Sequence, residues 1–304
     1  MNAGETLGIV GESGSGKSMT ALSILNLVPE PGRITGGQIL FKDRDVVSMT
    51  SGELHEYRGG DTAMIFQDPM TSLNPVLRVG FQIEEAMRAH SRFDKRQAKE
   101  RVIPLLERVR IPSPKERARD FPHQFSGGMR QRAMIAMGLA NEPALLIADE
   151  PTTALDVTVQ AQILELLKDL NRELGTAIIL ISHNVAVISS LCTRVMVMYA
   201  GRVVESGPTR QVFDHPEHPY TWSLLRSVPR VDERRHERLI SIQGMPPDLA
   251  RLPAGCTFHP RCQFKVERCT REEPPLAEVA ADQEARCWVL MRNVSKETRE
   301  AVKT

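Results

Sequence analysis

Residues 6–18 read TLGIVGESGSGKS, an apolar run followed at once by a turn rich in glycine and serine. The apolar run predicts a buried strand, and the residues from Lys17 to about Val28 predict a helix. The turn matches G-x-x-x-x-G-K-[ST], the pattern of a phosphate-binding loop, and it stands between a strand and a helix as such a loop requires. This context argues against an ordinary glycine-rich turn.

A loop of this kind captures an anion with its backbone. Glycines let the N–H groups wrap a phosphate, and the N-terminus of the following helix adds positive potential. We expect Lys17 to reach the β- and γ-phosphates and the Ser18 hydroxyl to ligate Mg²⁺. The residues predicted to contact the nucleotide are Gly11, Ser13, Gly14, Gly16, Lys17 and Ser18.

A second motif, ALLIADE at residues 144–150, places two carboxylates at the end of an apolar strand. A carboxylate is costly there unless it serves a cation, so Asp149 is predicted to hold Mg²⁺. Glu150 is the candidate for polarising an attacking water. An acidic pair at a strand end can also cap a helix, but the phosphate loop upstream favours the catalytic interpretation.

The rest of the chain alternates strands with helices, which predicts an α/β fold with a mainly parallel sheet. Residues 79–140 are mainly helical and charged, as expected of an insertion into that sheet. A long helix is predicted at 157–174. The other predicted strands are 38–41, 63–66, 177–181 and a pair at 195–198 and 202–205 joined by Ala200-Gly201.

With these motifs in order, the chain resembles the ATPase subunits of ABC transporters. FSGGMRQ at 125–131 resembles the family's signature loop, with Met129 where glutamine is usual. IFQDP at 65–69 resembles the Q-loop, residues 154–156 the D-loop, and ISHN at 181–184 the switch region. The resemblance implies that nucleotide is also contacted by Ser126, Gly127, Gly128 and Asp156, that Gln67 senses Mg²⁺ and the attacking water, and that His183 contacts the γ-phosphate.

The resemblance also implies an architecture: an ATP-binding core at 1–68 and 141–210, and a helical signature subdomain at 69–140. Two such subunits would close over ATP and drive two membrane permease subunits, served by an external solute-binding protein, from the cytoplasmic face of the inner membrane. In the family, two strands and an adenine-stacking aromatic precede the phosphate loop. Ten residues precede Gly11 here and none is aromatic, so we expect those strands to be missing and ATP binding to be weakened.

Beyond about Pro208 the composition changes, and Pro, His and Arg become frequent. HPYT at 218–221 and the later run GCTFHPRC at 255–262 resemble the C-terminal region of oligopeptide and dipeptide importer ATPases. Residues 211–304 are therefore predicted to be an importer-type extension, and the favoured solute is a peptide, with nickel or a glycan as alternatives. The arginine-rich run at 226–238 is interrupted by acids, which favours a solvated helix or linker over a basic patch.

Four of the five cysteines, Cys256, Cys262, Cys269 and Cys287, lie in the last 50 residues, whereas Cys192 is alone inside a helix-like stretch. A reducing cytoplasm disfavours disulfides, so the four predict a tetrathiolate site for zinc or an iron–sulfur cluster. The paired C-x-x-C spacing usual for zinc is missing. Resemblance to cysteine-bearing members of the subfamily favours [4Fe–4S], with zinc, free thiols or disulfides as alternatives.

Net charge and hydropathy argue against several other classes of protein. Lys plus Arg number 39 and Asp plus Glu 38, a net charge of +1, so a basic field for nucleic acid is absent. No apolar run reaches the roughly 18 residues that span a bilayer. The N-terminus lacks the basic segment of a signal peptide, so a cytoplasmic protein is expected. A soluble ABC-type ATPase of DNA repair or translation and a non-hydrolysing regulatory subunit remain the alternative functions.

Overall fold

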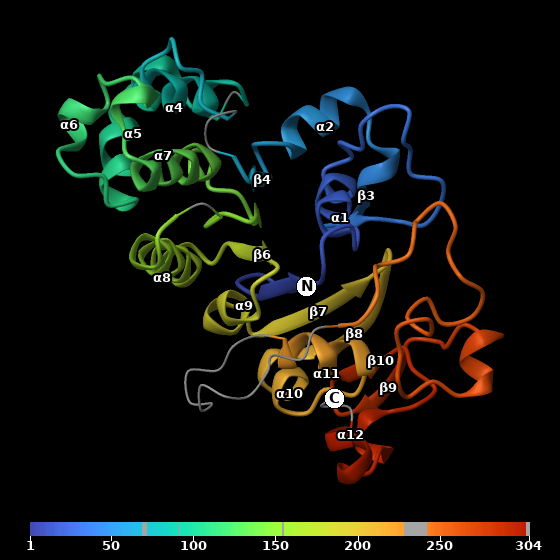
Figure 1. The fold of residues 1–304 in the computed structure, drawn as a ribbon. Helices are drawn as coiled ribbons and strands as arrows, with labels where there is room; N and C mark the ends of the chain where they lie inside the picture. Colours follow the sequence, from blue (N-terminus) through green and yellow to red (C-terminus); the bar gives the residue numbers. More distant parts are fainter. Residues whose placement is uncertain (69–71, 91, 154, 228–241, 302–304) are drawn as a thin grey trace. The chain divides into compact units, whose positions relative to one another are not determined.

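The computed structural model describes residues 1–68, 72–90, 92–153, 155–227 and 242–301. They form two compact units, one of residues 1–6 and 18–180 and one of residues 7–17 and 181 onward (Figure 1). In these ranges, no helix combines the length and the apolar character needed to cross a membrane. The predicted arginine-rich run lies mostly within 228–241, outside the described residues.

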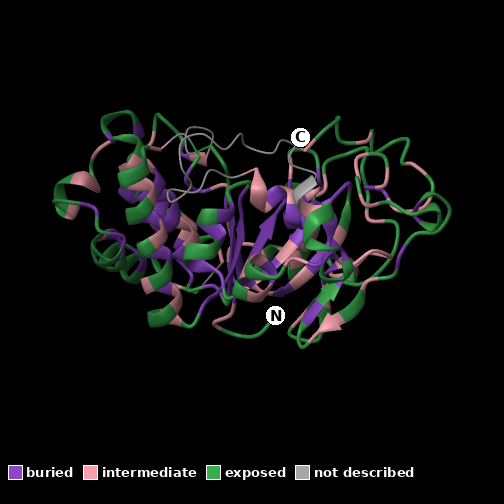
Figure 2. Ribbon diagram, turned by 60° about the horizontal axis from the view of Figure 1, so that its bottom comes forward, coloured by how far each residue is buried: buried purple, intermediate pink, exposed green. Residues whose placement is uncertain are grey.

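In the first unit, the sheet contains β4 (Thr62–Ile65), β5 (Leu145–Asp149) and β6 (Ala177–Ile181), in that order. β4 and β5 are parallel, with Thr62 opposite Leu145. Every residue of β5 and β6 is buried, and Figure 2 shows exposure concentrated on loops and the outer faces of helices. Continuous apolar runs are typical of parallel strands because both of their faces are covered.

Several helices of the first unit begin at polar caps that the sequence supplies. Asp94 and Gln97 form a capping box at α5, and Asp156 caps α8. Helices α4 to α7 gather in the insertion (Figure 1). The bounds are α1 (Lys17–Ile24), α2 (Ser51–Tyr57), α4 (Val79–Arg88), α5 (Lys95–Arg108), α6 (Pro114–Arg117), α7 (Gly127–Leu139) and α8 (Val157–Leu174), with a small hairpin of β2 (Leu40–Phe41) and β3 (Arg44–Asp45).

In the second unit, the sheet order is β1-β7-β8-β10-β9. β1 and β7 are parallel, and the remaining pairs are antiparallel. The predicted turn at Ala200-Gly201 is confirmed: φ is 48° and 74°, as a tight hairpin requires. The bounds are β1 (Thr6–Val10), β7 (Arg194–Tyr199), β8 (Arg202–Pro208), β9 (Ala277–Ala280), β10 (Gln283–Ala285), α9 (Val185–Leu191), α10 (Thr209–Asp214), α11 (Pro219–Arg226) and α12 (Lys296–Ala301).

Several predicted elements differ in their bounds. The first helix ends at Ile24 rather than near Val28, because Asn26 turns the chain with φ of 50° and the N–H groups of Asn26 and Leu27 donate back to the carbonyls of Ser23 at 2.9 Å and Leu22 at 2.7 Å. The carbonyls of Ile24 and Leu25 then accept from the Tyr57 hydroxyl at 2.9 Å and from Arg58 Nε at 2.7 Å. The strand predicted at 38–41 shrinks to two residues, and that at 63–66 begins and ends one residue earlier. Cys192 is the C-cap of α9 rather than inside a helix.

The region after Pro208 is joined to the sheet. β10 pairs with β8, so the last third of the chain adds two strands to the sheet that holds the phosphate loop's strand, β1. The domain boundaries expected at residues 68, 140 and 210 remain a prediction.

A buried carboxylate holds this junction. Glu205, on β8, has no exposed surface, and its side chain accepts hydrogen bonds from the backbone N–H groups of Glu217 and His218 at 2.8 and 2.9 Å and from Gln283 Nε2 at 2.8 Å. Burial raises the pKa of Glu205, while these donors oppose the rise. The carboxylate therefore ties the start of α11 and the start of β10 to β8.

We expect Glu205→Gln to lower the free energy of unfolding by on the order of 1–3 kcal/mol. The NH₂ group of the new amide cannot accept a hydrogen bond, so it would face the N–H donors that the carboxylate now binds. Urea denaturation of the purified chain measures this. Glu284→Gln, at an exposed position of β10, is the matched control and should change the urea midpoint little. Equal midpoints for the two variants would show that Glu205 does not hold the junction.

Candidate functional site

The phosphate loop connects β1 to α1, and its lysine is hydrogen-bonded to carbonyls of the loop itself. Lys17 is 7% exposed, and its ammonium donates to the carbonyls of Gly11 at 2.8 Å and Glu12 at 2.9 Å. The backbone N–H of Gly201 donates to the carbonyl of Ser15 at 2.9 Å. Ser13 and Gly14 are exposed, so the middle of the loop is open to a ligand.

Its glycines are required for two different reasons. A Cβ at Gly11 would lie 2.2 Å from the carbonyl oxygen of Met198, so backbone occupies the space of a side chain. Gly14 and Gly16 have φ of 76° and 100°, which disfavours residues with a side chain. The motif's glycines therefore follow from the shape of the loop.

The predicted catalytic carboxylate lies beside the predicted Q-loop residue. Gln67 Nε2 donates to Glu150 Oε2 at 3.4 Å, and Thr153 Oγ1 donates to the same oxygen at 2.9 Å. Glu150 has φ of 47°, an uncommon value for a residue with a side chain and one found at functional sites. Asp149, at the end of β5, is 7% exposed. Thr153 was not predicted from the sequence, where its one signal is its position three residues after Glu150.

The predicted signature and D-loop residues begin helices. Ser126 caps α7 by accepting from the N–H of Met129 at 3.3 Å, and Asp156 caps α8 by accepting from that of Val159 at 2.9 Å. Ser126, Gly127 and Asp156 are exposed, as are Ser18 and His183. A Cβ at Gly128 would lie 2.7 Å from Val159 Cγ1, so close packing against α8 requires this glycine. Pro69 and Ala154, which belong to the predicted motifs, lie outside the described residues.

The four C-terminal cysteines come together. Cys256, Cys262, Cys269 and Cys287 line one small cavity with Phe258 and Trp288 among its walls. None of them forms a disulfide. Burial raises the pKa of Cys262 to about 12 and also raises the pKa values of Cys256 and Cys287.

The spacing of the thiols decides whether they could hold one metal ion as positioned. In the described part of the chain, the group whose three ligand atoms all lie within 4.8 Å of one another is His55, Glu56 and His90, and no three of the cysteines form such a group. Zinc at about 2.3 Å from four sulfurs needs them about 3.8 Å apart. As positioned, the thiols are therefore not spaced as the four ligands of one zinc ion would be.

Comparisons with known proteins agree with this geometry. The model of the ABC transporter family matches residues 1–153, and that of the oligopeptide/dipeptide transporter C-terminal region matches residues 204–269. The oligopeptide transport ATP-binding protein OppD of Bacillus subtilis (strain 168) is 50% identical over 305 residues, covering 100% of this chain and 85% of that protein. The chain belongs to the ABC transporter ATPase family.

Other relatives of this ATPase support the assignment. OppD of Escherichia coli (strain K12) is 51% identical and covers 95% of this chain and 85% of that protein. The dimeric ATP-binding cassette MJ0796, in a post-hydrolysis state with ADP and Pi, has a TM-score of 0.61 at 29% identity and covers 69% of this chain and 88% of that one. CbiO1 of Clostridium perfringens has a TM-score of 0.62 at 28% identity, and the match covers 70% of this chain and 81% of that one. The predicted α/β ATPase fold is confirmed.

Family membership means that the ATPase binds and hydrolyses ATP with Mg²⁺, and the residues present fit that ion. A serine hydroxyl, Ser18, and a carboxylate, Asp149, are hard oxygen donors of the kind that Mg²⁺ prefers. The phosphate loop supplies a lysine and a helix N-terminus for the phosphates.

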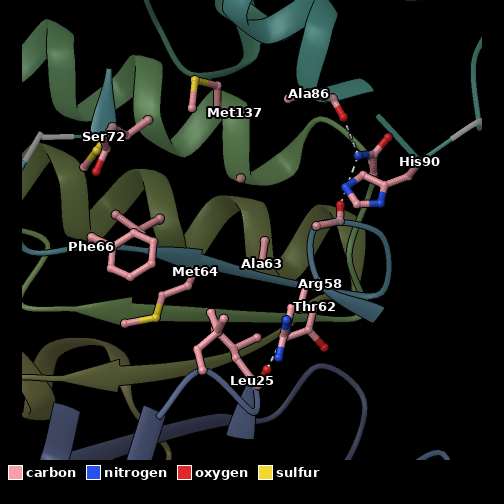
Figure 3. Close-up of a pocket in the computed structure, with 16 residues that line it drawn as sticks. Leu25, Arg58, Thr62, Ala63, Met64, Phe66, Ser72, Ala86, His90 and Met137 are labelled. Carbon is pink, nitrogen blue, oxygen red and sulfur yellow. Dashed lines mark hydrogen bonds between the residues drawn. The ribbon is translucent and has the colours of Figure 1, made fainter. Parts of the chain in front are cut away.

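A separate pocket of about 560 Å³ lies in the first unit. Figure 3 shows Phe66, Met64 and Ala63 of the β4 segment facing it, with Met137 of α7 on another wall and His90 at one end. Asn141 also lines the pocket, and its amide donates to the carbonyls of Gly59 and Ala86 at 3.0 and 2.9 Å. The pocket therefore touches both the strand that leads to Gln67 and the helix that follows Ser126.

Two Gly→Ala substitutions in the phosphate loop are expected to destabilise the protein by different amounts. Gly11→Ala should lower the free energy of unfolding by on the order of 3 kcal/mol, because the clash is with main chain and no rotamer relieves it. Gly14→Ala should cost about 1–2 kcal/mol, since only its positive φ opposes a side chain and no atom lies within 4 Å. Thermal unfolding without nucleotide compares the two, and a larger loss for Gly14→Ala would contradict the loop geometry.

Proposed function

We propose that this ATPase powers the import of peptides through membrane permease subunits. The observation that carries the proposal is that a phosphate-binding loop and an oligopeptide/dipeptide transporter C-terminal region occur in one chain. The 50% identity with OppD of Bacillus subtilis, which spans both parts, supports the same solute class. Peptide is preferred to nickel or a glycan on these grounds.

The proposed chemistry is hydrolysis of ATP by an activated water. Lys17 would turn from the loop carbonyls to the β- and γ-phosphates, and Ser18, Asp149 and Gln67 would hold Mg²⁺, whose charge neutralises the phosphates when it is bound. Glu150 would accept a proton from the attacking water, with Gln67 and Thr153 orienting its carboxylate. His183 would contact the γ-phosphate. The rate enhancement then comes from position and electrostatics rather than a covalent intermediate.

A second ATPase subunit, a homologue or another copy, would complete each site. Ser126, Gly127 and Gly128 would approach the γ-phosphate held by the partner subunit, with N–H groups at the start of α7 aimed at it. Asp156 would lie at the same contact. The exposure of Ser126 and Gly127 supports this role, and the similar cassette MJ0796 is dimeric.

The membrane partners would be two permease subunits, which receive solute from an external binding protein, and the ATPase would lie peripherally on the cytoplasmic face of the inner membrane. The apolar pocket in Figure 3 supports this arrangement. A permease helix seated there would touch both β4, which leads to Gln67, and α7, which follows the signature loop. Closure of the ATPase pair would then move the seated helix.

Glu150→Gln tests the hydrolytic role. The substitution keeps the shape of the side chain but removes the charge that polarises water, so turnover in the assembled transporter should fall by about 10²-fold or more while ATP still binds. Phosphate release measures turnover. Glu142→Gln, an exposed acid elsewhere in the same unit, should leave turnover unchanged.

Unchanged turnover in Glu150→Gln would remove this residue from its proposed role. Absence of hydrolysis in the unmodified transporter would favour a non-hydrolysing regulatory subunit. Co-purification with nucleic acid instead of permeases would favour a soluble ATPase of repair or translation. Uptake of labelled peptide, but not nickel or a glycan, by proteoliposomes containing the transporter and binding protein would support the solute class.

We infer that the four-cysteine cavity holds a [4Fe–4S] cluster, with zinc as the alternative. Four thiolates repel one another, so their convergence is explained by a cation or cluster that neutralises them. Because the cavity is built entirely in the C-terminal region, the cluster would be structural or regulatory.

Anaerobic purification should give a brown protein with broad absorbance near about 400 nm, as expected of thiolate-bound iron and sulfide. Single changes of Cys256, Cys262, Cys269 or Cys287 to Ser should lower the iron content. Cys192→Ser is the control and should not, because Cys192 does not line the cavity. A colourless preparation without iron would contradict the cluster, and stoichiometric zinc in it would support the alternative.

A further inference from the structure

The phosphate loop contains an acidic residue, Glu12, directly after its first glycine. A free carboxylate in an anion-binding loop would repel the phosphates of ATP. In the structure this charge is paired: Arg261 Nη1 donates to Glu12 Oε2 at 2.6 Å, and Arg261 Nη2 donates to Glu12 Oε1 at 3.0 Å. The two nitrogens and two oxygens form the bidentate geometry in which an arginine–carboxylate pair is strongest.

All three polar groups of Glu12 are engaged. Its N–H donates to the Tyr220 hydroxyl at 2.9 Å, its carbonyl accepts from Lys17 Nζ at 2.9 Å, and its carboxylate accepts from Arg261. Tyr220 and Arg261 both lie beyond residue 208, in the C-terminal region. Two of the three constraints on this residue of the phosphate loop therefore come from outside the ATP-binding motifs.

Arg261 is itself fixed in place. Its side chain is 5% exposed, and Nε and Nη2 donate to the carbonyls of Gln243 at 3.0 Å and Ile242 at 3.3 Å. Its guanidinium carbon lies 5.8 Å from the ring centre of Tyr199. Exposed ion pairs contribute little because water competes and the side chains move, but this guanidinium is buried and held from several sides.

A residue of the segment that carries Arg261 also lines the cysteine cavity. The Phe258 ring packs against Tyr199 and Tyr220 at centroid distances of 5.1 and 5.4 Å, and the backbone N–H of Arg261 donates to the carbonyl of Phe258 at 3.0 Å. Phe258 also lines the cavity with Cys262, the residue after Arg261. The segment that brings the thiols together thus also carries the arginine that reaches the phosphate loop.

We propose that Arg261 is a positioning residue for ATP binding: it neutralises Glu12 and fixes the phosphate loop in its binding conformation. The inference rests on the proposed function, and it gives the C-terminal region a role at the ATP site of its own chain. Its physical basis is preorganisation together with removal of a like charge from the phosphates. Arg261 acts through Glu12 and is not assigned any contact with the nucleotide.

The test measures Mg-ATP affinity and steady-state hydrolysis of the full transporter carrying Arg261→Met, Arg261→Lys, Glu12→Gln, or Glu12→Gln with Arg261→Met. Arg261→Met should weaken ATP binding and raise KM about tenfold with a much smaller change in kcat, because it exposes the Glu12 charge but leaves the hydrolytic residues in place. Arg261→Lys, which keeps the charge without the bidentate geometry, should be intermediate.

The double variant shows whether ATP affinity is lost through the unpaired Glu12 carboxylate or through a general disturbance of the structure. Adding Glu12→Gln to Arg261→Met removes the unpaired carboxylate, so most of the lost affinity should return, and the cycle should show a coupling of about tenfold. Arg271→Met removes an exposed ion pair with Glu267 in the same region and should leave KM unchanged.

Wild-type KM in Arg261→Met, or a double variant as weak as Arg261→Met alone, would overturn the inference. Both results require an unmodified transporter that binds and hydrolyses ATP. They are therefore distinct from failure of the proposed function, in which the unmodified protein would do neither.

Discussion

The structure depends on keeping the backbone of one short loop open to an anion. Residues 11–16 must present N–H groups to phosphate, and this requires glycine where the main chain of Met198 leaves no room at Gly11 and where φ is positive at Gly14 and Gly16. A loop with so few side chains of its own has little to hold it in shape. Its conformation is therefore maintained by neighbours: the strand before it, the helix after it, and polar contacts from distant parts of the chain.

Buried polar groups make those distant contacts, and they explain why the C-terminal region joins the sheet. Glu205 gathers the N–H groups of Glu217 and His218 and the amide of Gln283 onto β8. Arg261 and Tyr220 then reach Glu12 of the phosphate loop. A buried hydrogen-bonded charge is strongly directional, because misplacing either partner leaves it unsatisfied. These residues specify where the C-terminal region lies on β8 and how it approaches the loop.

The same region concentrates thiols that would repel one another as thiolates. Burial raises the pKa of Cys262 to about 12, so without a bound group the protonated form is favoured, and a bound metal or cluster reverses this preference. Cys262 directly follows Arg261, so a group held by the thiols would depend on the same backbone segment as the pairing of Glu12. The proposed iron–sulfur site would then be linked to the ATP site through two adjacent residues.

Much of this protein could be predicted from local sequence. The helix over 157–174 and the strand over 177–181 were predicted with the bounds observed, because long periodic or continuously apolar runs have one favourable way to be buried. The phosphate loop and the turn at Ala200-Gly201 were predictable because their backbone shapes require particular residues. The neighbouring thiols were predictable from their number and clustering.

Tertiary structure decided the rest. At the end of the first helix, the carbonyls of Ile24 and Leu25 are satisfied by Tyr57 and Arg58, some thirty residues away. The pairing of Glu12 with Arg261 spans 249 positions and leaves no local pattern. Local propensity and periodicity describe neighbours along the chain, whereas hydrogen bonds between distant side chains depend on how the strands are ordered in the sheet. The sequence by itself determined the ATP-binding motifs, and only the folded sheet determined which residues outside those motifs hold them.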